Sequence, residues 1–329
     1  MRIGIVDSGV DATHPDLVGK VDVSATCVGG PCREGAAIDD DGHGTAVAGI
    51  AVARAGNGAG TAGVAPDAHL VVAKALRSGV GSTDDIANAI QWVVDHGARV
   101  VNLSLGDSDR VLVRILGTPL QSSIEYAWSR GAIPVMAAGN YDEDVVERGS
   151  SNYGNLDAVV VGATGKDGRV TDYSTALGDA KWGVVAPGGQ GDGSGSDIVS
   201  SAPGGRYEWA AGTSMAAPHV SGTLALLLAQ GLSPAQAVRR LLETLDRSVP
   251  CGAGCQGLVR ADAAVGRPAN RPPAKTDAAA TGPARPRAPG RLSPVLIGLA
   301  SALAALSAAA SASALWRRPG CALSVGKRE

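Results

Sequence analysis

Short apolar runs that alternate with helix-like segments constrain the fold of this chain most strongly. The runs are rich in Val, Ala, Leu and Ile, and each ends in a turn or leads towards a helix-like stretch. Residues with this pattern are 2–7, 70–75, 98–106, 131–140, 158–163, 182–186 and 197–202. Because neighbouring parallel strands need a crossover, usually a helix, the alternation predicts an α/β fold with a doubly wound, mostly parallel sheet.

Three segments have the residue pattern of helices. In 83–96 the apolar side chains recur on one face, and Thr83 followed by two aspartates suits a cap and a first helical turn. Residues 46–53 are small and apolar, and 233–245 begin with a Ser-Pro pair that favours a helix start. The 46 glycines and the absence of Phe predict tight turns around a core of Val, Ala, Leu and Ile.

Three polar residues stand where such a sheet would place its chemistry. Asp7 ends the first apolar run, and functional groups of α/β sheets gather beyond the carboxyl ends of strands. His43 lies between two glycines, and Ser214 lies in a turn before a long apolar run. A helix N-terminus there would stabilise the negative charge that a serine nucleophile develops. Each residue alone also fits a turn, a surface histidine or an N-cap.

Five short motifs follow one another in a fixed order. They are Ile5-Val-Asp7-Ser-Gly9, Asp41-Gly-His43-Gly-Thr45, Asn102-Leu-Ser104-Leu-Gly106, Ala137-Ala-Gly-Asn140 and Gly212-Thr-Ser214-Met-Ala-Ala-Pro218. Together they resemble the subtilisin-like serine proteases, peptidase family S8, in which Asp, His and Ser occur in this order. The resemblance covers residues 2–265 and implies the three-layer αβα architecture and serine endopeptidase activity of that family.

The resemblance gives four residues a catalytic role. Ser214 would attack the scissile carbonyl, and His43 would accept its proton and pass it to the leaving amine. Asp7 would fix the imidazole tautomer and stabilise its charged form. Asn140 would donate its side-chain N–H to the oxyanion beside the backbone N–H of Ser214, although a residue after Gly139 also fits a plain turn.

The same resemblance implies where ligands bind. A peptide or protein substrate would lie as an extended strand between Ser104-Leu105-Gly106 and Gly79-Val80-Gly81. Catalysis of this kind requires no cofactor. The structural calcium site of the family is matched only in part, by Asp16 and Asn57, and these two residues fit a turn aspartate and a loop asparagine without a metal equally well.

The cysteines favour an oxidising compartment. Cys27 and Cys32 are close in sequence, as are Cys251 and Cys255, and neither pair has the C-x-x-C spacing of a zinc site. Short spans of this kind can turn and bring two Cα atoms within disulfide range, so we expect Cys27–Cys32 and Cys251–Cys255 disulfides. Free thiols are the alternative.

The composition changes sharply after residue 265, where we place the end of a peptidase domain spanning 1–265. Residues 266–293 are rich in Pro, Ala and Arg and predict a poorly ordered linker. Residues 294–316 carry no charge and are long enough to cross a hydrocarbon core of about 30 Å, so they predict one transmembrane helix. Residues 317–329 form a short basic tail; a low-complexity soluble tail is the alternative.

Charge excludes one class of partner. The net charge is −2, but basic residues outnumber acidic ones after residue 265, so the globular part is acidic and unsuited to nucleic acid. Basic residues flank both ends of the predicted span in similar numbers, so the positive-inside rule orients the span only weakly. The cysteine pairs and the protease resemblance therefore place the catalytic domain on the outer side of the cell membrane.

Protease domain, linker, single span and basic tail together resemble the mycosins, membrane-anchored proteases of type VII secretion systems. This architecture implies a tethered endopeptidase that processes substrates of a secretion complex. The alternative is a membrane-anchored scaffold or assembly component in which cleavage is dispensable or lost. Met1 falls almost on the first strand, whereas the family usually carries a signal peptide, a propeptide and an N-terminal arm before it, so we expect a truncated start.

Overall fold

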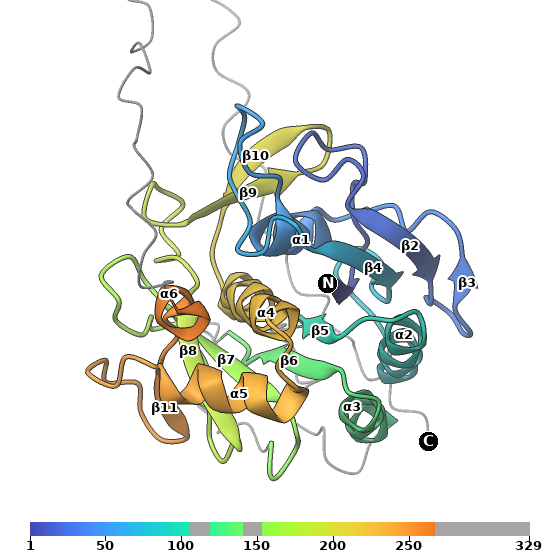
Figure 1. Cartoon of the computed structure of the whole chain (residues 1–329). Helices are drawn as coiled ribbons and strands as arrows, with labels where there is room; N and C mark the ends of the chain where they lie inside the picture. Colours follow the sequence, from blue (N-terminus) through green and yellow to red (C-terminus); the bar gives the residue numbers. More distant parts are fainter. Residues whose placement is uncertain (106–118, 141–152, 267–329) are drawn as a thin grey trace, which may run out of the picture. The chain divides into compact units, whose positions relative to one another are not determined.

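The computed structural model describes residues 1–105, 119–140 and 153–266 (Figure 1). The chain divides into two units, Met1–Arg271 and Pro272–Glu329, of which the first is described here. Residues 267–329, which hold nearly all of the predicted linker, span and tail, lie outside the described part. None of the described helices is both long enough and apolar enough to span a bilayer.

A nine-stranded sheet forms the centre of the described unit (Figure 1). Its strands are β1 (Arg2–Asp7), β2 (Val21–Thr26), β3 (Arg33–Glu34), β4 (His69–Lys74), β5 (Val100–Leu103), β6 (Ile133–Ala137), β7 (Val159–Thr164), β8 (Trp182–Pro187) and β11 (Cys255–Leu258). They lie in the order β11-β8-β7-β6-β5-β1-β4-β2-β3, and only β2 and β3 pair antiparallel. The mostly parallel, doubly wound sheet predicted from the sequence is confirmed.

Helices cover both faces of this sheet. On one face lie α1 (His43–Val52), α4 (Thr213–Ala229), α5 (Pro234–Glu243) and α6 (Ala261–Val265), and on the other lie α2 (Thr83–Asp95) and α3 (Pro119–Ser129). Successive side chains of a strand point to opposite faces, so Ile5 of β1 packs in the first core and Val6 in the second. The result is the predicted three-layer αβα arrangement.

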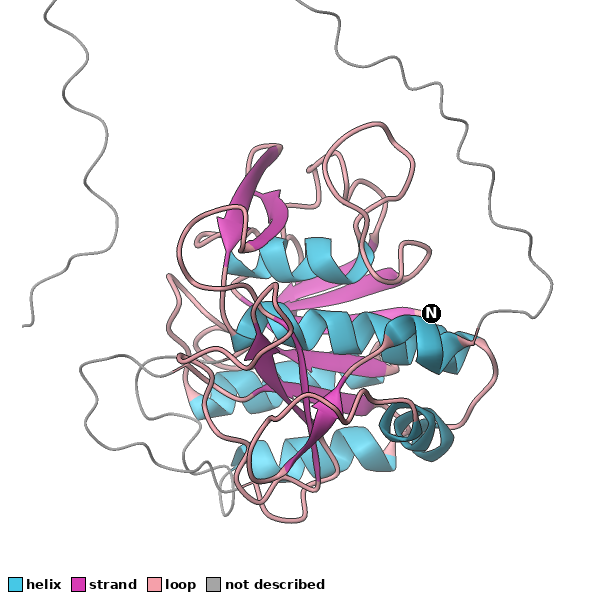
Figure 2. Cartoon of the chain, turned by 90° about the vertical axis from the view of Figure 1, so that its left-hand side faces the viewer, coloured by secondary structure: helices cyan, strands magenta, loops and turns pink. Residues whose placement is uncertain are grey.

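Helix α4 lies at the centre of the first core. Its buried residues occur on all sides of the helix, which is the pattern of a helix surrounded by other elements. The segment 197–202, expected as a strand, forms β9 (Ile198–Ala202). It pairs antiparallel with β10 (Arg206–Ala210) in a separate two-stranded sheet, which stands apart from the main sheet at the top of Figures 1 and 2.

Both expected disulfides are formed. Cys27–Cys32 closes the loop between β2 and β3, and Cys251–Cys255 closes the loop that leads into β11. The fifth cysteine, Cys321, lies outside the described residues. The two bridges are local, and each restrains a single loop rather than joining distant parts of the fold.

Candidate active site

The four residues predicted for catalysis lie at the carboxyl edge of the sheet. Asp7 ends β1 beside β5, at the point where the strand order reverses. Asn140 follows β6, while His43 begins α1 and Ser214 is the second residue of α4. In doubly wound sheets this reversal opens a crevice for ligands, because the loops on its two sides diverge.

The buried carboxylate of Asp7 holds the ring of His43. Asp7 Oδ1 lies 2.8 Å from His43 Nδ1 and also accepts a hydrogen bond from the backbone N–H of Ser8 at 2.7 Å. Asp7 Oδ2 is buried without a hydrogen-bond partner among the described residues. An ionised carboxylate only accepts hydrogen bonds, so the neutral ring carries its proton on Nδ1 and keeps a lone pair on Nε2.

A second buried aspartate fixes the start of α1 and therefore the position of His43. Asp39 Oδ1 accepts hydrogen bonds from the backbone N–H of Gly42 at 2.9 Å and from Ser8 Oγ at 2.8 Å. Asp39 Oδ2 accepts one from the backbone N–H of Thr45, also at 2.9 Å. The first N–H groups of a helix lack partners within it, and Asp39 supplies an acceptor for them.

Nearby charges favour the protonated form of His43. Burial lowers the pKa of the ring, but the charge of Asp7 and its hydrogen bond, together with the charges of Asp41 and Asp39, outweigh burial and raise the pKa of His43 to about 9. The ring of the free protein therefore favours the imidazolium form. It must lose a proton before it can accept one from a serine.

Ser214 exchanges hydrogen bonds with Ser104, which follows β5. Ser214 Oγ donates to the carbonyl oxygen of Ser104 at 3.3 Å, and Ser104 Oγ donates to the carbonyl oxygen of Ser214 at 2.8 Å. Behind them, Asn102 donates to Ser104 Oγ and accepts from Ser221 Oγ. No hydrogen bond joins Ser214 to His43 in the described part of the chain, and such bonds are often long before a substrate binds.

The side chain of Asn140 is held by its oxygen, and its N–H₂ group donates to none of the described residues. Asn140 Oδ1 accepts hydrogen bonds from the backbone N–H of Thr213 at 2.9 Å and from its hydroxyl at 3.1 Å. Asn140 Nδ2 donates to no described residue, and a Cβ at Gly212 would lie 3.2 Å from it. The amide nitrogen of Asn140 therefore lies at the start of α4, close to Ser214.

Comparison with known proteins gives the family of this chain. The subtilase family, Peptidase S8, matches residues 1–270. The chain belongs to the subtilase family. This membership places it among the subtilisin-like serine endopeptidases, which bind peptide substrates, as the five motifs predicted.

Several bacterial proteases are similar to this subtilase. The thermophilic serine proteinase of Bacillus sp. strain AK1 is 39% identical over 75% of this chain, which spans 56% of that relative. Thermitase of Thermoactinomyces vulgaris is 36% identical, with 75% of this chain and 81% of thermitase covered. A solved protease structure from Pseudoalteromonas arctica has a TM-score of 0.66 and 29% identity, covering 80% of this chain and 89% of that one.

The segments of the subtilase predicted to bind substrate differ in exposure. Ser104 and Leu105 are buried, and Gly106 lies outside the described residues. The segment Gly79-Val80-Gly81 begins in a tight turn in which Arg77 and Val80 exchange backbone hydrogen bonds of 2.8 and 3.0 Å. Val80 is 73% exposed, so this turn presents an apolar side chain to solvent.

The two predicted calcium ligands are in contact with each other. Asp16 is buried, its Oδ1 accepts a hydrogen bond from Asn57 Nδ2 at 2.5 Å, and its Oδ2 has no hydrogen-bond partner among the described residues. Asn57 thus turns an N–H rather than an oxygen towards the carboxylate. The described residues contain no group of three or more His, Cys, Asp or Glu side chains that could hold a metal ion.

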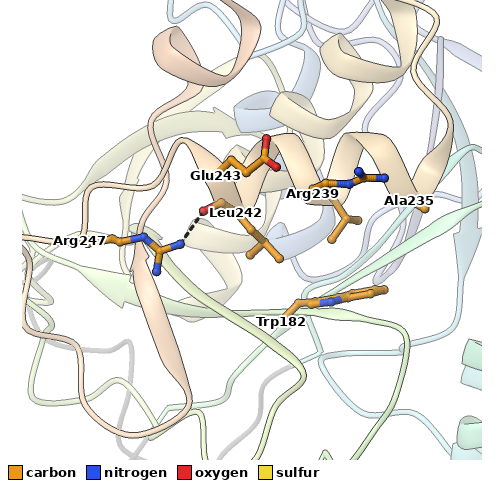
Figure 3. A pocket seen from close by; sticks show the side chains of 7 residues that line it. Trp182, Ala235, Arg239, Leu242, Glu243 and Arg247 are labelled. Atoms are coloured by element: carbon orange, nitrogen blue, oxygen red, sulfur yellow. Dashed lines mark hydrogen bonds between the residues drawn. The ribbon is translucent and has the colours of Figure 1, made fainter.

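A cavity of about 290 Å³ lies away from these residues, between β8 and α5 (Figure 3). It is lined by Trp182, Ala235, Val238, Arg239, Leu242, Glu243 and Arg247. Trp182 begins β8, whereas Asp7 ends the parallel strand β1, so the cavity lies at the opposite edge of the sheet. It is separate from the edge that holds the four residues predicted for catalysis.

Sequence reasoning assigned no role to the residues that support the four predicted ones. Asp39, Asn102, Thr213 and Ser221 are polar, and all four are buried. Asn102 and Ser221 interrupt apolar runs of β5 and α4, and a polar residue in such a run is a signal that could have pointed to them. Asp39 lies in a loop and Thr213 is the first residue of α4, and the sequence offers no comparable signal at either position.

Proposed function

We propose that Asp7, His43 and Ser214 form the catalytic triad of this endopeptidase and that Asn140 is its oxyanion donor. The 2.8 Å contact between Asp7 Oδ1 and His43 Nδ1 carries the proposal. It ties a buried acid to the ring nitrogen that points away from the reaction and leaves Nε2 for the nucleophile. Ser214 and Asn140 lie at the same edge of the sheet.

The steps follow from these positions. Ser214 Oγ attacks the carbonyl carbon while its proton passes to His43 Nε2, and Asp7 stabilises the resulting imidazolium. The negative oxygen of the tetrahedral intermediate accepts hydrogen bonds from Asn140 Nδ2 and the backbone N–H of Ser214. His43 then protonates the amine as the C–N bond breaks, and water hydrolyses the acyl-enzyme by the same route in reverse.

The substrate would add as a strand to the exposed segment Gly79-Val80-Gly81. Main-chain hydrogen bonds of such an added strand give affinity for peptides in general, and pockets for alternate side chains give specificity. The predicted opposite wall, Ser104-Leu105-Gly106, follows β5 and is joined to Ser214 through Ser104. An extended peptide between these segments would bring its carbonyl carbon to Ser214.

A fluorophosphonate probe tests the nucleophile, because it reacts with activated serines. We expect labelling of the natural chain and its complete loss in Ser214→Ala, with an unchanged circular dichroism spectrum. Ser233→Ala is the matched control, since Ser233 is also at a helix N-terminus but caps α5 on the surface. Equal labelling of Ser214→Ala and the natural chain would rule out the assignment.

We also propose that the protease is tethered to the cell membrane by residues 294–316, with its catalytic domain on the outer side. The uncharged run supports the span, and the two disulfides support an oxidising compartment. The mycosin-like order of domain, linker, span and tail supports a role in processing substrates of a type VII secretion complex. The hydrogen bond between the buried Asp7 carboxylate and His43 favours an active protease over an inactive scaffold.

A structural calcium ion at Asp16 and Asn57 is a further proposal. The buried carboxylate of Asp16 is a suitable ligand for a cation, and rotation of the Asn57 amide would turn its oxygen towards the same point. Calcium takes 6–8 oxygen ligands, so backbone oxygens and water would complete the set. The ion would tie the loop of Asn57 to Asp16 and take no part in the chemical steps.

A further inference from the structure

Lys74 is a buried lysine next to the triad acid. It ends β4, and in the parallel register of β1 and β4 it lies directly beside Asp7. Its side chain is 9% exposed, and Nζ donates hydrogen bonds to the carbonyl oxygen of Ser8 and to Asp40 Oδ1, the latter at 2.7 Å. A buried ammonium needs such partners, and here one of them belongs to the residue that follows Asp7.

Asp40 extends this contact to the substrate-binding turn. The oxygen that pairs with Lys74 also accepts a hydrogen bond from the backbone N–H of Ser78, at 3.2 Å. Ser78 and Gly79 are the central residues of the turn in which Arg77 and Val80 exchange backbone hydrogen bonds. One carboxylate oxygen therefore connects the buried ammonium to the turn that exposes Val80.

The conformation of Ser78 shows that this turn needs support. Its φ is +48°, and among the described residues it is the one non-glycine residue with positive φ. A serine in the left-handed region is strained and keeps this conformation only where its surroundings hold it. The hydrogen bond from Ser78 to Asp40 is such a restraint.

We propose that Lys74 and Asp40 are positioning residues that fix the turn 77–80 relative to Asp7, and so set the affinity of the enzyme for extended peptides. The inference rests on the proposed substrate segment 79–81. The Lys74 ammonium donates to the carbonyl oxygen of Ser8, which follows Asp7. It also pairs with Asp40, which accepts a hydrogen bond from the turn 77–80. Neither residue would touch the reacting atoms, so both act on binding rather than on the chemical step.

The first experiment compares two substrates in the full-length protein. In Asp40→Ala we expect the KM of an apolar tetrapeptide p-nitroanilide, which reaches Val80, to rise about tenfold, because a charge-assisted hydrogen bond is lost. The KM of a single-residue ester and the kcat for both substrates should stay unchanged. Asp40→Asn keeps an oxygen acceptor for Ser78 and should restore most of the affinity.

A buried lysine elsewhere provides the matched control. Lys20 is 8% exposed, and its Nζ donates to the carbonyl oxygen of Pro66 before the amino end of β4, far along the strand from Lys74. Lys74→Met should raise the tetrapeptide KM as Asp40→Ala does, whereas Lys20→Met should leave the ratio of the two KM values unchanged. Asp40 is partly exposed, so Asp40→Ala carries the test if Lys74→Met does not fold.

Binding without cleavage separates this inference from the proposed triad. In a Ser214→Ala background, calorimetry with the uncleaved peptide should show about a tenfold higher Kd when Asp40→Ala is added. If the fluorophosphonate probe does not label the natural chain, the proposed nucleophile is contradicted. The Kd comparison remains valid in that case, because it measures binding without cleavage. An unchanged Kd, or equal KM changes for the long and the short substrate, would overturn the positioning role of Lys74 and Asp40.

Discussion

The amide oxygen of Asn140 accepts two hydrogen bonds from Thr213, the residue immediately before Ser214. The proposed oxyanion donor and the proposed nucleophile are therefore fixed to one helix N-terminus, although they are far apart in sequence. Because both acceptor sites of the Asn140 oxygen are used, the amide cannot rotate without losing two bonds. Its N–H₂ group is held in one orientation before any substrate arrives, which is what preorganised electrostatic stabilisation requires.

Asn140→Ala should lower kcat for a peptide substrate by about 10²–10³-fold with little change in KM, because the bond is made only in the transition state. Thr213→Val removes the hydroxyl bond to Asn140 but keeps the backbone one, so its kcat should fall less. Steady-state kinetics on both variants, with thermal unfolding as a control for folding, measure this. A KM effect without a kcat effect would place Asn140 in ground-state binding instead.

The charges around His43 predict activity that rises into the alkaline range. The unprotonated ring is the base, so kcat/KM, which reports the free enzyme, should rise with pH through a midpoint near the His43 pKa of about 9. Asp41→Asn removes one negative charge beside the ring and should lower this midpoint by about half a pH unit, since exposed charges are partly screened. A pH profile on an uncharged peptide measures both midpoints.

Two controls sharpen this experiment. Raising the ionic strength should shrink the difference between Asp41→Asn and the natural chain, because salt screens an exposed charge. Asp84→Asn, an exposed acid in the first turn of α2, is a matched control in which the midpoint should not move. A midpoint near 6.5 in the natural chain would show that the carboxylates do not govern the ring.

Much of the fold could be predicted from the sequence because buried parallel strands and amphipathic helices leave local patterns. The helix expected at 83–96 is α2, and the run ending in Asp7 is β1. Strands β2 and β10 escaped prediction, since they are only partly buried and their residues show no clear apolar run. The pairing of β9 with β10 also depends on contacts that no local pattern records.

The site was predictable in part for a similar reason. The glycines around His43 are readable in retrospect: Gly42 has a φ of +101°, and a Cβ at Gly44 would clash with the carbonyl oxygen of Gly9. The motifs indicated the four positions now proposed for catalysis. The supporting contact of Lys74 with Asp40 joins a strand end to a loop, and such a contact appears only once the chain is folded.

Calcium should stabilise the domain if it binds at Asp16 and Asn57. At a calcium concentration about 100 times the Kd, binding contributes about 2.7 kcal/mol, which corresponds to a Tm increase on the order of 5 °C for a domain of this size. Differential scanning calorimetry with calcium, magnesium or a chelator measures this. Asp16→Asn should abolish the calcium-dependent shift, whereas Asp67→Asn should keep it; equal shifts in all three proteins would contradict this site.

The proposed membrane anchor gives a further prediction, because it would decide where the enzyme works. Residues 294–316 should keep the full chain in the membrane fraction through an alkaline carbonate wash, since a spanning helix satisfies its own backbone hydrogen bonds and offers only apolar side chains to lipid. Introducing two lysines near its centre, at Leu303 and Leu306, should release the protein, because charges at the bilayer centre are costly. Two lysines at Ala274 and Ala278 in the linker are the matched control and should leave it bound.

Truncation after Asn270, where the family match ends, separates anchoring from catalysis. The truncated protein should be soluble and keep kcat/KM on a short peptide, because the proposed triad and both cores lie before residue 267. Its cleavage of a substrate fixed in the same vesicles should fall, since tethering supplies a high effective concentration that the free domain lacks. If the full chain washes off with carbonate, or if the truncated domain fails to fold, residues 271–329 belong to the globular unit and the tethered-protease proposal is wrong.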